Sequence, residues 1–249
     1  MAILVGIFGL LWKLYLFVVL AVTTLIMHPI IWLFLFSEKG RKKAFKLFVI
    51  WSWTFRLLGF YQVKKLQEKA LPKGPFILVG NHISYLDIFL LYSIFPSHPF
   101  LFLGKSEILS YPFFRTYFKA LNIPVYRNDK IKSGRSIVQT YRKIEKGWSI
   151  VIFPEGGIPS ENNPHMIPFK EGAFQIAKRA GLPIVPITFI NNHKLFSDPT
   201  NLLGPASPGV SKVHIHSYIT KEEVSGLSIN ALKNKCFDII NAPLKQANS

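Results

Sequence analysis

The sequence contains very little cysteine and few acidic residues. A single cysteine, Cys236, occurs in 249 residues, so no disulfide can form within the chain. Asp and Glu total 13 against 30 Lys and Arg, which gives a formal net charge of +17. Such an excess indicates an anionic partner, which can be nucleic acid, an anionic membrane surface or a phosphate-bearing substrate. The hydrophobic fraction of 49% argues against a disordered chain.

Two widespread catalytic motifs are also missing. The chain has no Gly-x-x-x-x-Gly-Lys phosphate-binding loop and no Gly-x-Ser-x-Gly nucleophile elbow. His214 and His216 alternate along a predicted strand, as two metal ligands can, but the sequence places no third ligand near them. We therefore expect no metal site.

A long uncharged run lies near the start of the chain. Residues 14–36 carry no charged side chain, and Lys13 is the single charge between residues 2 and 36. At about 1.5 Å per residue, this run reaches roughly 34 Å as a helix, enough to cross a bilayer core of about 30 Å. The basic residues that follow predict that the rest of the chain lies in the cytoplasm; they are Lys39, Arg41, Lys42, Lys43 and Lys46.

Other placements of the N-terminal segment stay open. His28 and Pro29 lie inside the apolar run and can bend it, so a helix that enters one leaflet and returns is the alternative. Residues 41–60 form a second helical stretch, basic at first and then rich in Trp and Phe, which suits either the headgroup level or packing on a globular domain. We expect membrane-anchoring helices over residues 1–61 and a globular domain over residues 62–249.

Beyond residue 62, short apolar runs alternate with longer stretches of helical periodicity. This alternation predicts an α/β fold, with a mainly parallel or mixed sheet covered by helices. The expected strands are Phe76–Gly80, Pro99–Leu103, Ile123–Tyr126, Ser149–Phe153, Ile184–Ile190 and Lys212–Tyr218. The expected helices are Ser84–Ile94, Pro112–Leu121, Ile131–Lys146, Glu171–Ala180 and Ser228–Ala247.

Candidate site residues follow the predicted strands, because ligands bind beyond the carboxyl ends of strands in open α/β sheets. His82, Arg127 and Glu155 each follow one strand, and we expect them at the same sheet edge. A neutral imidazole can take a proton from an attacking alcohol, which makes His82 a candidate general base. Asp87 can hold its ring, as in a serine-protease triad. Alternatively, Asp87 completes a capping box with Ser84.

Five segments resemble motifs of the glycerophospholipid acyltransferase family, whose type member is 1-acylglycerol-3-phosphate acyltransferase. Asn81-His82-x-x-x-x-Asp87 is similar to the first motif, and Phe153-Pro154-Glu155-Gly156 to the third. The other agreements are Ile123-Pro124-Val125-Tyr126-Arg127 with the second motif, Ile184-Val185-Pro186-Ile187 with the fourth, and Phe169-Lys170-x-Gly172 with a further family segment. Their order and spacing match over most of the chain that follows the N-terminal helices.

The resemblance implies a membrane-bound O-acyltransferase. Such an enzyme moves a fatty acyl group from an acyl thioester, either acyl-CoA or acyl carrier protein, to the free hydroxyl of a lysolipid. The expected acceptor is 1-acylglycerol-3-phosphate and the expected product is phosphatidate, with catalysis by His82 and Asp87 and without a metal or other cofactor. The other motif residues are Asn81, Pro154, Gly157 and Pro186.

One position departs from the family pattern. The segment Glu155–Ile158 ends in isoleucine, where the family has an arginine that helps to hold the acceptor phosphate. The resemblance leaves Arg127 and Lys170 for that contact, since guanidinium and ammonium groups both suit a phosphate. Glu155 and Gly156 are expected beside them, with Glu155 either binding an acceptor hydroxyl or fixing the phosphate-binding turn.

Further roles and functions stay open. Backbone N–H groups near Gly156 and Gly157 are expected to stabilise the oxyanion, and Lys105 is a further candidate for contacting a phosphate. The acceptor can also be a different lysolipid, such as a lyso-aminolipid. From another functional class, a membrane-tethered protein that binds an anionic ligand has the same charge. Nucleic acid is not expected as a partner, because most aromatic residues lie in apolar runs rather than among the cations.

Overall fold

The computed structural model describes residues 2–110, 112–126, 128–159 and 165–248. Its centre is a seven-stranded sheet with the order β1-β7-β6-β2-β5-β3-β4. The strands are β1 (Tyr61–Glu68), β2 (Ile77–Gly80), β3 (Phe100–Lys105), β4 (Ile123–Val125), β5 (Ser149–Ile152), β6 (Ile184–Phe189) and β7 (Gly209–Ile215). Neighbouring strands are parallel except β6 and β7, which are antiparallel. The predicted α/β fold with a mainly parallel or mixed sheet is confirmed.

The edge strand β1 was not predicted, and β7 lies about three residues earlier than expected. The first difference follows from the composition and position of β1. β1 has the sequence YQVKKLQE, and all but one of its side chains keep some contact with solvent. It pairs only with β7, at the sheet edge, so it lacks the apolar run by which the central strands are recognised. By contrast, every residue of β2, β5 and β6 is buried.

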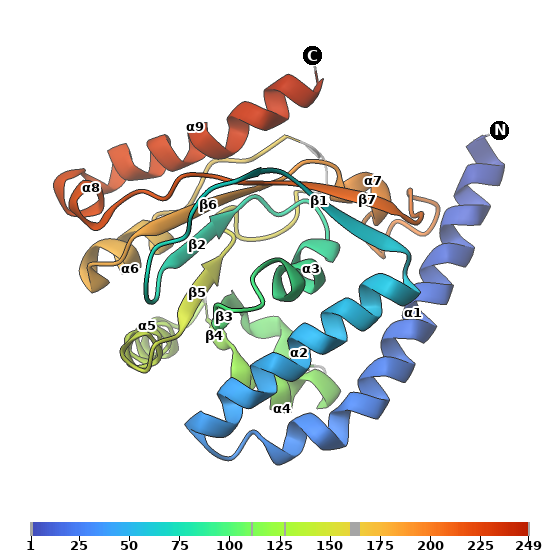
Figure 1. Ribbon diagram of the computed structural model, residues 1–249, viewed down its shortest axis with the longest axis horizontal. Coiled ribbons are helices and arrows are strands. Elements are labelled where there is room, and N and C mark those ends of the chain that lie inside the picture. The colour runs from blue at the N-terminus through green and yellow to red at the C-terminus, as the bar shows by residue number, and fades with distance from the viewer. Residues whose placement is uncertain (1, 111, 127, 160–164, 249) are drawn as a thin grey trace.

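Helices cover both faces of the sheet, as Figure 1 shows. The longest helix that follows the first strand, α9 (Ile229–Asn248), lies along one face, and α3 (Leu86–Ile94) lies on the other. The remaining helices that border the sheet are α4 (Pro112–Leu121), α5 (Lys130–Glu145) and α6 (Gly172–Ala180). Short helical segments complete the chain: η1 (Ser106–Ser110), α7 (Asn192–Leu195) and α8 (Lys221–Gly226).

Two long helices precede the sheet. Helix α1 (Ala2–Leu33) continues without interruption through Pro29, and α2 (Glu38–Leu58) begins at Ser37, whose side chain accepts a hydrogen bond from Gly40 N. Between Leu4 and Leu33, α1 is long and apolar enough to cross a membrane. Helix α2 packs on the domain, because Trp51, Ser52 and Phe55 are buried and the Ser52 hydroxyl donates to Phe89 O at 2.6 Å.

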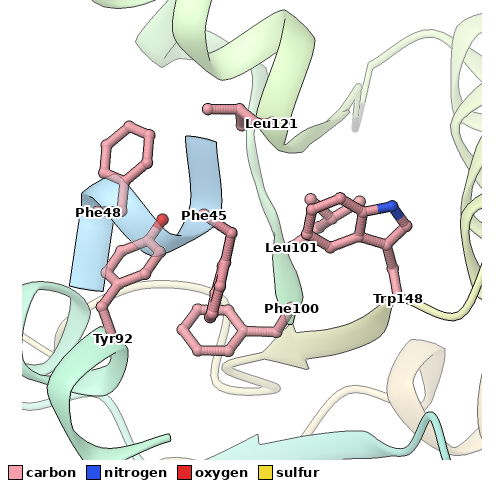
Figure 2. Close-up of a pocket in the computed structure, with 7 residues that line it drawn as sticks. All are labelled: Phe45, Phe48, Tyr92, Phe100, Leu101, Leu121 and Trp148. Atoms are coloured by element: carbon pink, nitrogen blue, oxygen red, sulfur yellow. The ribbon is translucent and has the colours of Figure 1, made fainter. Parts of the chain in front are cut away.

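Aromatic side chains join α2 to the domain core. The ring of Phe45 lies 5.1 Å from that of Phe100 and 5.7 Å from that of Tyr92. Trp148 completes the cluster, and its Nε1 donates to Glu38 Oε1 at 2.5 Å. Figure 2 shows these rings around a small cavity that Phe48, Leu101 and Leu121 also line. The N-terminal helices therefore share one core with the sheet.

Candidate active site

The carboxyl end of β2 leads into the buried residues Asn81 and His82. The Asn81 side chain donates from Nδ2 to Phe189 O at 2.9 Å, and its Oδ1 accepts from Phe189 N at 2.8 Å. These bonds replace the ladder contacts that β2 would make with the end of β6. Asn81 therefore fixes the point at which the chain leaves the sheet, and so where the next residue lies.

Asp87 holds the His82 ring and the turn that carries it. Its Oδ2 lies 2.9 Å from His82 Nδ1 and accepts hydrogen bonds from Ile83 N at 2.9 Å and Ser84 N at 3.0 Å. Asp87 therefore makes the contacts of both predicted roles: it accepts hydrogen bonds from the backbone of the turn, and it orients the His82 ring. Helix α3 begins later than predicted, at Leu86, because the Ser84 hydroxyl accepts from Leu86 N at 3.1 Å.

This geometry leaves one ring nitrogen of His82 for chemistry. When Nδ1 donates to the carboxylate, the Nε2 lone pair is the proton acceptor of a neutral ring. The His82 side chain is 10% exposed and that of Asp87 is fully buried. On one face, the Phe153 ring stacks against the imidazole at 4.2 Å with an interplanar angle of 14°. Gly80 allows close packing against β6, since a Cβ there would lie 2.8 Å from Ile187 Cγ2.

Glu155 links the His82 turn to Ile167, in the segment between β5 and α6. Its Oε1 accepts from His82 N at 2.8 Å, and its Oε2 accepts from Ile167 N at 3.1 Å. Burial raises the pKa of this carboxyl to about 7, with a smaller contribution from the charge of Asp87, while the two backbone hydrogen bonds oppose the rise. The contacts favour the second of the two predicted roles, in which Glu155 fixes the turn.

The segment after β5 forms a tight turn. Gly156 has a φ of +85°, which favours glycine, and its N–H donates to Phe153 O at 3.0 Å. That backbone N–H therefore closes the turn, contrary to the oxyanion role expected for it. Pro154 O accepts from Lys170 N at 2.9 Å, while the Lys170 side chain is exposed.

Lys105, at the carboxyl end of β3, lies beside this turn. A Cβ at Gly157 would lie 3.0 Å from Lys105 Nζ, so the ammonium occupies the space that a side chain at position 157 would fill. Strand β3 is the direct neighbour of β5 in the sheet, which explains the proximity. The structure thus brings a cation next to Ile158, where the motif lacks its arginine.

One predicted motif residue, Pro186, is not part of this cluster. Pro186 lies within β6, opposite Val79 of β2, and is buried in the sheet. Arg127 lies outside the described residues.

His214 and His216 stack at 5.8 Å, and His216 Nε2 lies 2.8 Å from Thr188 Oγ1. In the described part of the chain, no group of three His, Cys, Asp or Glu side chains could hold a metal ion.

Asn192 was missed by the sequence analysis. It is fully buried at the start of α7, and its Nδ2 donates to Asp87 Oδ1 at 2.7 Å. Its own Oδ1 has no hydrogen-bond partner among the described residues. A signal was present, because Asn192 follows the predicted strand Ile184–Ile190 just as His82 and Glu155 follow theirs.

Comparisons with known proteins agree on one family. An acyltransferase family model matches residues 62–190. A chloroplastic 1-acyl-sn-glycerol-3-phosphate acyltransferase of Brassica napus is 30% identical over 228 residues, which cover 90% of this chain and 63% of the relative. A 1-acyl-sn-glycerol-3-phosphate acyltransferase of Saccharomyces cerevisiae is 32% identical over 197 residues, which cover 78% of this chain and 63% of the relative.

One solved structure shares the fold over almost the whole chain. It is the 1-acyl-sn-glycerophosphate acyltransferase PlsC from Thermotoga maritima, with a TM-score of 0.77 and 21% identity. The match covers 98% of this chain and 97% of that one. The shared part therefore includes the N-terminal helices as well as the sheet.

Proposed function

Because this chain belongs to the acyltransferase family, we propose that it transfers a fatty acyl group from a thioester carrier to the free hydroxyl of 1-acylglycerol-3-phosphate, giving phosphatidate. The resemblance predicted from the motifs is confirmed at the level of the family. The observation that carries the proposal is the buried pair of His82 Nδ1 and Asp87 Oδ2 at 2.9 Å. It presents Nε2 as a base at the sheet edge where ligands bind.

The reaction needs one proton shuttle. His82 Nε2 takes the proton of the acceptor hydroxyl while the oxygen attacks the thioester carbonyl carbon. A C–O bond forms and a tetrahedral oxyanion results. The carbonyl then re-forms, the C–S bond breaks, and the thiolate receives the proton from His82. Asp87 stabilises the imidazolium between the two transfers. All the proton chemistry is accounted for by side chains of this chain, without a metal or other cofactor.

Oxyanion stabilisation is assigned by elimination near the same turn. The Gly156 N–H already donates to Phe153 O at 3.0 Å. The next backbone N–H, that of Gly157, is therefore our candidate donor. The Phe153 ring is stacked on His82 at 4.2 Å. It stabilises the protonated imidazole that forms when His82 takes the proton, because an aromatic face attracts positive charge.

Lys105 and Arg127 are the proposed phosphate-binding cations. Lys105 Nζ lies against Gly157, one residue from the isoleucine that replaces the family arginine. An ammonium at this point restores the positive charge without the fork-shaped contact of a guanidinium. Lys170 is exposed just before α6 and is the outer candidate. The alternative acceptor is a lyso-aminolipid, for which the phosphate contact would matter less.

The acyl acceptor and product are membrane lipids, which makes α1 and α2 the proposed membrane-attachment elements. The apolar length of α1 supports attachment by burial rather than by charge. The protein should accordingly stay with membranes through a high-salt wash, because salt does not screen apolar burial. The basic start of α2 supports placing the catalytic domain on the cytoplasmic face.

Thiol release tests the proposal directly. Purified protein in detergent or vesicles receives acyl-CoA or acyl carrier protein as donor and lysophosphatidate as acceptor, and free thiol and phosphatidate are measured together. Both should appear in equal amounts with wild type and be nearly lost with His82→Ala. If lysophosphatidate binds but neither product forms with either donor, the chain is a membrane-tethered binding protein instead.

A further inference from the structure

A hairpin between α7 and β7 packs on the membrane helix α1. It spans residues 196–206, is closed by a bridge between Phe196 and Ala206, and lies beside the N-terminal half of α1 in Figure 1. The approach is close, because a Cβ at Gly9 would lie 2.9 Å from Gly204 O. The hairpin backbone bonds mainly to itself, with Ser197 N donating to Pro205 O at 2.9 Å.

The hairpin covers the one charge of the apolar helix. Lys13 is buried, and its Nζ donates to Asn201 O. Asp198 contributes an attractive charge from the same hairpin. A lysine in a lipid-facing helix is costly unless a polar partner or the headgroup region accepts it. The hairpin supplies that partner, so Lys13 marks the level at which α1 meets polar surroundings.

The tip of the hairpin is apolar and exposed. Leu202 and Leu203 are 61% and 64% exposed. A Cβ at Gly6 would lie 3.4 Å from Leu203 Cβ, so the tip packs against the N-terminal part of α1. Helix α1 itself carries exposed apolar side chains along most of its length, among them Leu4, Phe8, Leu11, Phe17, Leu25 and Leu33.

The base of the hairpin belongs to the catalytic domain. Phe196 O accepts a hydrogen bond from the Ser84 hydroxyl at 2.6 Å, and Leu195 O accepts one from the Tyr61 hydroxyl at 3.3 Å. The hairpin therefore lies on the same side of any membrane as the His82 turn. The level marked by Lys13 must lie on that side too.

The other end of α1 is also held by the domain. His28 contacts Tyr117 of α4, whose hydroxyl donates to His28 O at 3.2 Å. From Gly9 to His28 the helix rises about 28 Å, close to the roughly 30 Å of a bilayer core. A crossing helix would therefore place the hairpin and α4 at opposite membrane surfaces, although both are parts of one domain. The contacts therefore indicate that α1 does not cross the membrane and stays on the side where the domain lies.

We propose that the hairpin is a lipid-contact element, with Leu202 and Leu203 inserted into the same leaflet that receives α1. The inference rests on the proposed membrane attachment. A lipid occupant is favoured over a protein because the tip packs against an apolar helix long enough for a bilayer, and because basic residues follow that helix at the start of α2. The polar hairpin backbone places the leucines at the headgroup–acyl boundary rather than deeper.

Single environment-sensitive fluorophores test this placement. The native Cys236 is fully buried, so an introduced surface cysteine can be labelled selectively, with the unsubstituted protein as the labelling blank. Leu203→Cys reports on the hairpin. Leu25→Cys on α1 is the membrane reference, and Ile131→Cys on α5 is the aqueous reference; these two positions are 69% and 72% exposed. Labelled full-length proteins are reconstituted in vesicles of phosphatidylethanolamine and phosphatidylglycerol, with or without nitroxide-labelled lipid.

The expected result is a shift of the Leu203 probe to shorter wavelength, with quenching by a nitroxide near the headgroup. The Ile131 probe should keep its aqueous emission and be quenched by iodide in the buffer. If the Leu203 probe behaves like the Ile131 probe while the Leu25 probe is quenched by lipid, the hairpin inference is wrong and membrane attachment stands. A blue-shifted Leu203 probe that no lipid quenches would show a protein contact and also overturn it. If the Leu25 probe escapes lipid quenching as well, the proposed membrane attachment fails with it.

Discussion

The side-chain amide of Asn192 lies 2.7 Å from Oδ1 of Asp87. The same carboxylate holds His82 Nδ1 and two backbone N–H groups through its Oδ2. Each oxygen of the fully buried Asp87 side chain thus has a hydrogen-bond partner. Asn192 reaches this carboxylate from α7, so the orientation of the His82 ring depends on two elements far apart in the chain.

Asn192→Ala should lower kcat while leaving KM for both substrates near wild type. The change removes a hydrogen bond to a buried charge, worth about 1.5–3 kcal/mol, which corresponds to roughly a 10- to 150-fold loss if it is felt fully in the transition state. Steady-state kinetics measure the effect. Asn191→Ala is the matched control, because the neighbouring asparagine bonds to the β7 backbone instead. An unchanged kcat would show that Asp87 needs no support from α7.

His82→Ala should reduce kcat by roughly 10² to 10⁴, the usual contribution of a positioned general base. Asp87→Asn should also lose most activity, because a neutral amide stabilises an imidazolium poorly. Its fold should persist, since an Asn Oδ1 can still accept from the N–H groups of Ile83 and Ser84. Thermal unfolding checks the fold, and His98→Gln, at the amino end of β3, is the histidine control. Near-wild-type turnover of Asp87→Asn would reduce Asp87 to a capping residue.

The acceptor site can be tested by removing or adding positively charged side chains. Lys105→Ala and Arg127→Ala should each lower kcat/KM for lysophosphatidate by roughly 10- to 150-fold, the loss of one charge-assisted contact. Ile158→Arg should leave that value unchanged or raise it. A lyso-aminolipid provides the comparison, since its turnover should respond little to these changes. If wild type turns over the aminolipid but ignores lysophosphatidate, the phosphate assignment is wrong, while the chemistry at His82 stands.

Glu155 should make the fold less stable as pH rises. Its pKa is about 7 in the folded chain against 4.5 ordinarily, so its stabilising contribution is fully present below about pH 4.5 and is lost as pH approaches 7. The difference amounts to about 3 kcal/mol. Unfolding free energies of wild type and Glu155→Gln, measured from pH 4.5 to 8, should therefore change relative to each other across this window. The exposed Glu171→Gln variant is the control, and parallel curves for Glu155→Gln and wild type would contradict the prediction.

Glu38 should stabilise the docking of α2 in a pH-dependent way. Burial alone would raise its pKa, but hydrogen bonds from Lys143 and Trp148 and the charge of Arg41 outweigh it and lower the pKa to about 2. Because the folded pKa is depressed, the stabilisation is present above about pH 4.5 and disappears as pH falls towards 2. Glu38→Gln should thus cost about 1–2 kcal/mol at neutral pH, the scale of a partly exposed charged hydrogen bond, and nothing near pH 2. Glu145→Gln on α5 is the control in the same unfolding experiment.

The local sequence pattern was sufficient to predict the central strands and the pairing of His82 with Asp87. Strands β2, β5 and β6 are buried on both faces, so a continuous apolar run in the sequence predicts each of them. The contact between His82 and Asp87 lies within one turn, where five residues of spacing and the hydrogen bonds of that turn bring the groups together. Such contacts depend on neighbours in sequence, which a sequence pattern records directly.

The remaining parts of the site depend on strand order and packing. Asn192 meets Asp87 from 105 positions away because β6 lies next to β2, and Lys105 meets Gly157 because β3 lies next to β5. No local pattern carries that order. The contacts of α1 were equally beyond local pattern. Its composition predicts an apolar helix, but not that the helix contacts a hairpin near residue 201. The sequence determined by itself which groups could react. Only tertiary structure decided which groups hold them and on which side of the domain the apolar helix lies, because both follow from contacts between segments that are distant in the chain.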